Sequence, residues 1–248
     1  MPSGNVSPFI SRLPASARVL FVSAGEALPE QLIPGSLPTS ITSHYAGAGG
    51  GKKGRQPLPE RSEVQAWLAE AGIDDNTDIV VYDAGNGSHA ARAWWVLNWA
   101  GHHRVFILDG GLKGWQPEAA TTDTISAPPV GHFQEITTDD ITRHPDDFLL
   151  VDARNQKVFE GEGVAPSHLP GAINLPVASL QDEQGRLLPY EQRKQIVAAL
   201  NLTNSSRPVV AYCGAGIASA WLAAALYDLD VNAALYAGSW SAWSAKDQ

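Results

Sequence analysis

The sequence predicts an α/β fold of two tandem domains, each with a mostly parallel central sheet flanked by helices. Two observations support this prediction. Short apolar runs alternate with helical patterns along the whole chain, and the second half repeats the first. Strands that are apolar throughout are typical of parallel sheets covered on both faces. A single long repeat indicates a duplicated domain, because solenoids repeat at shorter periods.

The first half contains three predicted strands and two predicted helices. Apolar runs predict strands at 17–24, 78–84 and 104–110. A helix predicted over 59–72 begins at a proline, has acidic residues early and ends at Gly72. Proline at the start and glycine at the end are usual helix boundary signals. A second helix, predicted over 87–101, also ends at a glycine.

The second half repeats this order. Strands are predicted at 147–153, 207–213 and 232–238, and helices at 189–201 and 216–228. The run DIVVYD corresponds to PVVAYC, LDGGLKGW to YAGSWSAW, and LIPGS to HLPGA. We therefore expect a first domain over 1–118, a linker rich in Thr, Ala and Pro over 119–135, and a second domain over 136–248.

Composition excludes several classes of function. The net charge is −9 and no basic run exceeds the pair Lys52–Lys53, which argues against a nucleic-acid binder. One cysteine among 248 residues cannot form an internal disulfide or a multi-thiolate metal site. The start of the chain lacks the apolar core of a signal peptide, and no apolar run is long enough to cross a bilayer. We expect a cytoplasmic protein that contacts no membrane.

That cysteine, Cys213, lies between the strand predicted at 207–213 and the helix predicted at 216–228. Open α/β sheets bind ligands at the carboxyl ends of their strands. The glycine-rich turn and the start of a helix supply free N–H groups there, and such groups favour a thiolate nucleophile. We predict that Cys213 is catalytic and that the loop after it binds the substrate: Gly214, Ala215, Gly216, Ile217, Ala218 and Ser219.

Several motifs together resemble a known family. The run VYDAGNGSHAARAWWVLNWAGHHRVFILDGGLKGW in the first half, and LVDAR, SHLPGAINLP, VVAYCGAGIASA and GSWSAW in the second, are similar to the two-domain rhodanese-type sulfurtransferases. This group comprises thiosulfate and 3-mercaptopyruvate sulfurtransferases. The resemblance implies two rhodanese-like domains and a persulfide formed on Cys213. It also implies a first domain that is not catalytic, because Asp83 stands where the second domain has Cys213.

The resemblance is weaker at the residues that hold the substrate. Family members carry a basic residue before the aromatic residue that follows the D-x-R motif, and here that residue is Val158. The loop serine of the mercaptopyruvate enzymes is replaced by Ala215, and their first-domain His and Asp by Leu32 and Ser23. Arg154 and Lys157 are candidate anion-binding residues, although Arg154 is expected to form a structural ion pair with Asp152. The group Lys52, Lys53 and Arg55, on a long glycine-rich loop over 44–59, is another candidate.

The sequence therefore predicts a sulfurtransferase that moves sulfur from a small anionic donor, thiosulfate or 3-mercaptopyruvate, to an acceptor. The acceptor is expected to be a thiol, cyanide or a thioredoxin-like protein, and no metal or other cofactor is required. A carrier of persulfide, or an anion-binding protein with little turnover, is the alternative. A cysteine phosphatase or related hydrolase is disfavoured, because its phosphate-binding arginine would stand at Ser219. The tryptophans are expected to pack the core and the domain interface.

Overall fold

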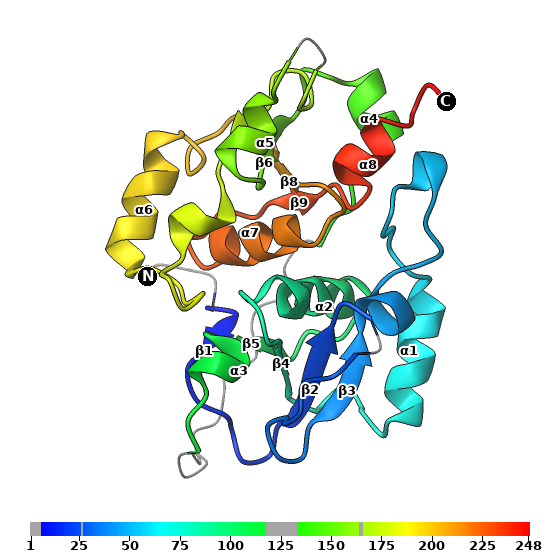
Figure 1. Ribbon diagram of the computed structural model, residues 1–248, viewed down its shortest axis with the longest axis vertical. Helices are drawn as coiled ribbons and strands as arrows, with labels where there is room; N and C mark the ends of the chain where they lie inside the picture. Colours follow the sequence, from blue (N-terminus) through cyan, green and yellow to red (C-terminus); the bar gives the residue numbers. More distant parts are fainter. Residues whose placement is uncertain (1–5, 26, 118–132, 164–165) are drawn as a thin grey trace.

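The computed structural model describes residues 6–25, 27–117, 133–163 and 166–248 (Figure 1). It contains two parallel sheets, one from each half of the chain, with helices on both. This arrangement confirms the predicted fold class. Most of the linker expected over 119–135 lies outside the described residues, so the domain boundaries remain a prediction.

The first sheet has five strands in the order β1-β5-β4-β2-β3, all parallel. Each residue of its central strand, β4, is buried, as expected of a strand with helices on both faces. The bounds are β1 Phe9–Ile10, β2 Arg18–Ser23, β3 Leu37–Ser40, β4 Ile79–Tyr82 and β5 Val105–Leu108. The helices are α1 Arg61–Glu70, α2 Ser88–Trp99 and α3 Gly111–Gly114, with a short π-helix, η1 Ile41–Tyr45, and a 3₁₀ turn, η2 Gly51–Lys53.

The second sheet has four parallel strands in the order β7-β6-β8-β9. The bounds are β6 Leu149–Asp152, β7 Ile173–Asn174, β8 Val209–Tyr212 and β9 Ala234–Leu235. The helices are α4 Thr138–Arg143, α5 Gln156–Glu160, α6 Tyr190–Ala199, α7 Ala218–Tyr227 and α8 Ser239–Trp243, with a 3₁₀ turn, η3 Val177–Leu180.

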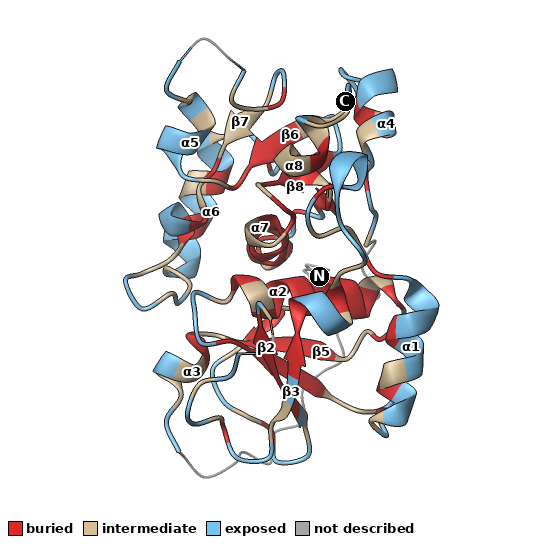
Figure 2. Ribbon diagram, turned by 45° about the vertical axis from the view of Figure 1, so that its right-hand side comes forward, coloured by how far each residue is buried: buried red, intermediate tan, exposed pale blue. Residues whose placement is uncertain are grey.

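The two domains meet through α2 and α7, which lie side by side between the sheets (Figure 1). Nearly every residue of both helices is buried, and Figure 2 shows both helices largely red at the middle of the molecule. Each helix covers its own sheet with one face and the other domain with the opposite face. This double burial explains why neither helix has the polar side of an ordinary surface helix.

Matching hydrogen bonds show that the repeat in the sequence is a repeat in structure. The Ile33 amide donates to the Tyr82 hydroxyl in the first domain, as the Leu169 amide does to Tyr212 in the second. These bonds join the two PG-containing turns to β4 and β8. The two α/β units are therefore built alike around the ends of their central strands.

The predicted strands and long helices are all present, with each strand shorter at its ends than expected. Gly72 ends α1 with φ of +71°, as predicted, because a left-handed residue suits glycine. Sequence patterns missed β1, β3 and β7. These strands are short and lie at or near sheet edges, so only pairing with their neighbours defines them.

The tryptophans pack largely as predicted. Trp94 and Trp95 are buried on α2, and their rings contact Phe133 of the inter-domain segment. Trp221 on α7 packs edge-on against Phe9 of the first domain, with ring centroids 5.9 Å apart. No helix within the described ranges is long and apolar enough to cross a bilayer.

We expect Trp221→Ala to destabilise the protein strongly, because the ring is fully buried between the domains. Removing a buried tryptophan side chain costs about 3–5 kcal/mol of unfolding free energy. Urea denaturation followed by circular dichroism measures the loss. Tyr190→Ala, at an exposed position on α6, serves as the control. Equal effects of the two substitutions would contradict the interdomain packing.

Candidate active site

Cys213 follows β8 directly and lies at the carboxyl edge of the second sheet, as predicted. The residue is only 3% exposed. The chain then turns through Gly216, whose φ is +80°, and enters α7 at Ala218. A Cβ atom at position 216 would lie 2.5 Å from the Ala237 carbonyl oxygen, so only glycine fits this turn.

Two donors point at the sulfur. The Gly216 amide donates to Cys213 Sγ at 3.1 Å, and the Ser219 hydroxyl donates to it at 3.3 Å. Ser219 lies in the first turn of α7 and is fully buried. Both donors favour negative charge on sulfur, since hydrogen bonds to a charged acceptor are the stronger ones. The donor role of the Ser219 side chain was not predicted from the sequence.

The backbone of Cys213 is fixed by the first turn of α8. The Cys213 amide donates to Ser239 Oγ at 3.1 Å, and the Trp240 amide donates to the Cys213 carbonyl at 2.9 Å. Ser239 in turn donates to the Tyr236 carbonyl at 2.7 Å. Hydrogen bonds with α8 therefore fix the Cys213 main chain, and the Ser219 hydroxyl on α7 bonds to the sulfur itself.

A buried arginine from the first domain supports the same loop. Arg92, on α2, is completely buried, and its guanidinium donates to the Gly216 carbonyl at 3.0 Å. Its Nε donates to the Tyr45 carbonyl, and its Nη2 donates to the Gln56 and Pro57 carbonyls. One side chain thus joins the Cys213 loop to the long loop of the first domain.

The charge of Arg92 also bears on the thiol. Burial lowers the pKa of Arg92 to about 10, and the negative charges of Cys213 and Glu135 act in the opposite direction. Arg92 therefore stays protonated at neutral pH. Its hydrogen bonds to described residues all go to carbonyl oxygens, so no bonded carboxylate among those residues neutralises the charge. A nearby thiolate offsets part of that buried charge.

The first domain shows what the equivalent loop holds. Asp83, at the position that corresponds to Cys213, is buried and accepts three amide hydrogen bonds, from Gly85, Gly87 and Ala90 at 2.9–3.0 Å. The carboxylate fills the cradle that the first turn of α2 forms. The shared architecture is therefore one that binds an anion at the end of the central strand.

The two predicted anion-binding residues, Arg154 and Lys157, both belong to the second domain. Arg154 pairs with Asp152 at 2.7 Å, donates to the Ser167 carbonyl and lies over the Trp240 ring, which confirms the expected structural ion pair. Lys157 is exposed on α5. His168 stacks on Phe159 and lies 2.8 Å from its carbonyl oxygen, as expected of a residue that positions a loop.

Among the first-domain residues singled out in the sequence, Leu32 and Ser23 contact their own domain, whereas the glycine-rich loop contacts the second domain. Leu32 packs into a cluster on the first sheet, and Ser23 donates to the Gly25 and Thr39 carbonyls. The glycine-rich loop, by contrast, reaches the second domain. Nη2 of Arg55 lies 3.1 Å from the position that a Cβ atom would take on Gly214. Of the candidate cations, Arg55 is thus the one in contact with the Cys213 loop.

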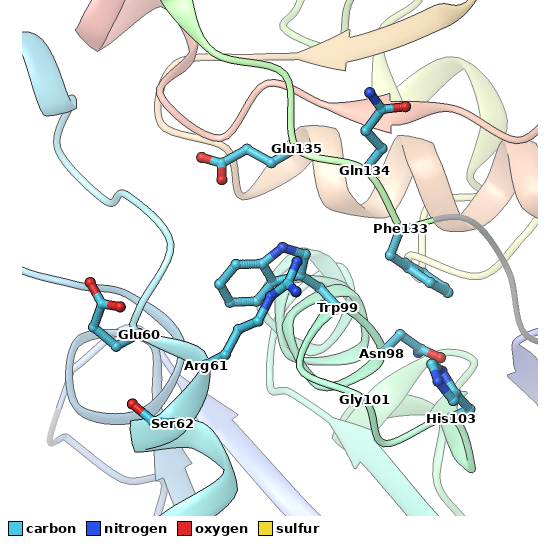
Figure 3. Close-up of a pocket in the computed structure, with 10 residues that line it drawn as sticks. All are labelled: Glu60, Arg61, Ser62, Asn98, Trp99, Gly101, His103, Phe133, Gln134 and Glu135. Atoms are coloured by element: carbon cyan, nitrogen blue, oxygen red, sulfur yellow. The ribbon is translucent and has the colours of Figure 1, made fainter.

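A large cavity of about 1030 Å³ opens beside the domain junction (Figure 3). Arg61 lies over the Trp99 ring at 4.4 Å, and Glu135 faces them from the segment that enters the second domain. Burial raises the pKa of Glu135, while the charges of Arg92 and Arg61 lower it. The cavity is lined by none of the loop residues predicted to bind substrate.

Comparison with known proteins agrees with this architecture. The rhodanese-like domain family matches residues 28–118 and 137–246. The chain belongs to the rhodanese family. It is 37% identical to "Probable 3-mercaptopyruvate sulfurtransferase" of Pseudomonas aeruginosa over 78% of this chain and 74% of that protein. It is 29% identical to thiosulfate sulfurtransferase of Gallus gallus over 75% and 70%.

A solved structure supports the same conclusion. The chain aligns with the 3-mercaptopyruvate sulfotransferase SseA from Escherichia coli with a TM-score of 0.69 and 27% identity, covering 92% of this rhodanese and 94% of SseA. The two rhodanese-like domains predicted from the sequence are therefore confirmed.

Sequence reasoning missed Arg92, and it placed Ser219 in the substrate-binding loop without the donor role of its side chain. Arg92 carried one signal, a lone charge within the apolar run AARAWWVL of a predicted helix. Such a charge is rarely buried unless it is bonded. Ser219 carried the weaker signal of one polar residue in an alanine-rich helix. Neither signal identifies the partner, which comes from another element.

We expect Arg92→Lys to reduce stability although the charge is kept. A lysine ammonium has three donors and no fork, so carbonyls among the four now bonded lose their partner. Each buried acceptor left unpaired costs about 1–3 kcal/mol. Thermal unfolding measures the change. Arg143→Lys, on the exposed pair with Asp139, should leave the melting temperature unchanged. An equally harmless Arg92→Lys would contradict the bridging role.

We expect Ser219→Ala to make the Cys213 thiol less reactive. Loss of a hydrogen bond to a charged acceptor should slow alkylation by iodoacetamide at pH 7 about tenfold. The rate is followed by intact-mass spectrometry. Ser244→Ala, at an exposed position beyond α8, is the control and should react like the wild type. An unchanged rate in Ser219→Ala would rule out stabilisation of the thiolate by this hydroxyl.

Proposed function

We propose that this rhodanese is a sulfurtransferase that carries sulfane sulfur on Cys213. The observation that carries the proposal is the sulfur itself, bonded by the Gly216 amide and the Ser219 hydroxyl beside the buried Arg92 cation. Named sulfurtransferases that are similar over most of the chain support the same activity. A thiolate held in this way is both a nucleophile and a stable leaving group.

The first half-reaction loads the enzyme. The Cys213 thiolate attacks the outer sulfur of thiosulfate, a new S–S bond forms, and the S–S bond of the donor breaks. Sulfite leaves with the electron pair, and the outer sulfur of the persulfide carries the negative charge. The Gly216 amide and the Ser219 hydroxyl, which bond to the thiolate, then lie beside an anionic persulfide. These donors therefore stabilise both the free thiolate and the persulfide.

The second half-reaction restores the thiolate. Cyanide or a thiolate acceptor attacks the outer sulfur, and the bond to Cys213 Sγ breaks with the electron pair returning to Sγ. Thiocyanate or an acceptor persulfide is released. A second cysteine is not available in this chain for an internal disulfide, so the sulfur must leave to an external acceptor. Reduced thiols of the cytoplasm, including thioredoxin-like proteins, suit this role.

Thiosulfate fits the site better than 3-mercaptopyruvate. Sulfite leaves thiosulfate as a stable anion without a proton, whereas pyruvate needs a proton on the carbon that loses sulfur. Position 215 of the loop is an alanine, which cannot supply or relay that proton. Arg154 and Lys157 remain proposed contacts for the donor anion, together with the loop amides over 214–219.

A persulfide carrier with little turnover is the second candidate. The 3% exposure of Cys213 favours it, because a large acceptor cannot reach a thiol so deeply placed without movement of the loop. Small acceptors such as cyanide are less restricted. The size of the acceptor therefore separates the two candidates.

We expect wild-type protein to gain one sulfur atom on incubation with thiosulfate and to release thiocyanate catalytically when cyanide is added. Intact-mass spectrometry and a thiocyanate assay measure the two steps. Cys213→Ser, with nearly the same volume, should do neither. Uptake of sulfur with a single turnover would support the carrier. Equal sulfur uptake by wild type and Cys213→Ser would refute the persulfide mechanism.

A further inference from the structure

The glycine-rich loop of the first domain is held against the active-site end of the second. Figure 1 shows it rising from the first sheet to α8. The Arg55 amide donates to Ser241 Oγ at 3.0 Å, and a Cβ atom on Gly54 would lie 2.8 Å from the Gly238 carbonyl oxygen. Only a glycine can approach α8 so closely, and its φ of +82° requires glycine as well.

The loop is also braced internally. The Gly50 amide donates to the Gly54 carbonyl at 2.8 Å, and the Gly47 amide to the Pro57 carbonyl at 2.9 Å. At its base, Arg92 donates to the Gln56 and Pro57 carbonyls and, with the same guanidinium, to Gly216. The loop and the Cys213 turn are therefore fixed to one buried group, and their separation is set by it.

The Arg55 side chain is placed over the turn. Its Nη2 lies close to Gly214, the residue after Cys213, and it is exposed to solvent. Within the described part of the chain, its guanidinium makes no hydrogen bond or ion pair. All five of its N–H donors are available to a ligand.

The other cations near the site either bond to protein oxygens or line a different cavity. Arg92 and Arg154 are bonded to protein oxygens. Lys52 and Lys53 line a neighbouring cavity of about 390 Å³ that Asp139 also lines. Among the described residues, Arg55 is thus the guanidinium that lies against the loop carrying the nucleophile and is not paired.

We infer that Arg55 binds the anionic end of the sulfur donor, so that the first domain supplies the cation and the second supplies the thiolate. This inference rests on the proposed function. A guanidinium matches the oxygens of a sulfonate-like or carboxylate group with two parallel hydrogen bonds. It would hold the donor with its oxygens toward solvent and its outer sulfur toward Cys213, and the donor would bind only where the two domains meet.

The second domain provides a matched control. Its own loop lies over the Asp83 turn in the same manner, with Gly185 against Asn86 and the Arg186 guanidinium donating to the Gly114 carbonyl at 3.2 Å. Arg186 is an exposed arginine on a reciprocal loop. Its guanidinium lies against Gly110 and Gly114 of the first domain, and the turn that its loop covers holds the Asp83 carboxylate and no thiol. Removal of Arg186 should therefore not affect a donor anion at Cys213.

The test compares thiosulfate kinetics of wild type, Arg55→Ala, Arg55→Lys and Arg186→Ala, with cyanide as acceptor. Loss of a charge-assisted bidentate contact should raise the KM for thiosulfate about 10- to 100-fold in Arg55→Ala. Arg55→Lys should recover part of the loss, and Arg186→Ala should match wild type. Melting temperatures should be equal in wild type and Arg55→Ala, because the substituted side chain bonds to no described residue.

A binding measurement gives an outcome that does not depend on turnover. Calorimetry with thiosulfate on Cys213→Ser, with and without Arg55→Ala, should show a loss of affinity of the same size. An unchanged KM and an unchanged affinity in the Arg55→Ala variants would overturn the role of Arg55 and leave the sulfurtransferase mechanism standing. Absence of sulfur transfer to wild-type Cys213 would overturn both.

Discussion

The burial of one guanidinium, that of Arg92, constrains the active site more than any other interaction. A charged side chain loses its hydration when it is buried, and the loss is tolerable only if its donors are satisfied. Arg92 makes four hydrogen bonds, to carbonyls at the end of η1, at the base of the glycine-rich loop and in the Cys213 turn. The position of each segment is thereby tied to the others. Its charge also makes the surrounding low-dielectric space favourable for an anion, and the sulfur of Cys213, like the Glu135 carboxylate, is a group on which that charge acts.

Duplication followed by divergence explains how such a site arises. Both domains end their central strand in a turn whose N–H groups surround an acidic position, Asp83 in one domain and Cys213 in the other. In the first domain, the Asp83 carboxylate accepts hydrogen bonds from the N–H groups of its turn and so stabilises the fold. A thiol in the second leaves a reactive atom in an equivalent environment. Each domain then covers the turn of the other with a loop bearing an arginine, Arg55 or Arg186, so the two turns are similar in shape while only one contains a nucleophile.

The depth of the thiol has a chemical consequence. Cys213 is only 3% exposed, and this burial shields it from oxidants and from most large thiols, which would protect a persulfide between the half-reactions. It also confines direct transfer to small molecules unless the surrounding loops move. Because those loops are anchored to α8 and to Arg92, access is coupled to the packing of the two domains. The interface formed by α2 and α7 therefore contributes to function as well as to stability.

The sequence by itself determined the fold class, the duplication, the long helices and central strands, the family and the position of Cys213. These features depend on local periodicity, on glycine and proline at boundaries, and on motifs that are contiguous in the chain. The short strands β1, β3 and β7 were not predicted, because pairing with neighbouring strands defines them and their own residues do not. Arg154 was correctly expected to pair with Asp152, since the two residues lie two positions apart on the same element.

Only the tertiary structure decided which groups surround the sulfur. Arg92 is 121 positions from Cys213 in the chain and Arg55 is still further, and both come from the other domain. A side chain's charge is visible in the sequence, whereas its burial, its partners and its distance to a thiol depend on how two helices and two loops pack. That packing brings two first-domain cations to the Cys213 turn: Arg92, which is bonded to the Gly216 carbonyl, and Arg55, whose guanidinium is bonded to no described residue.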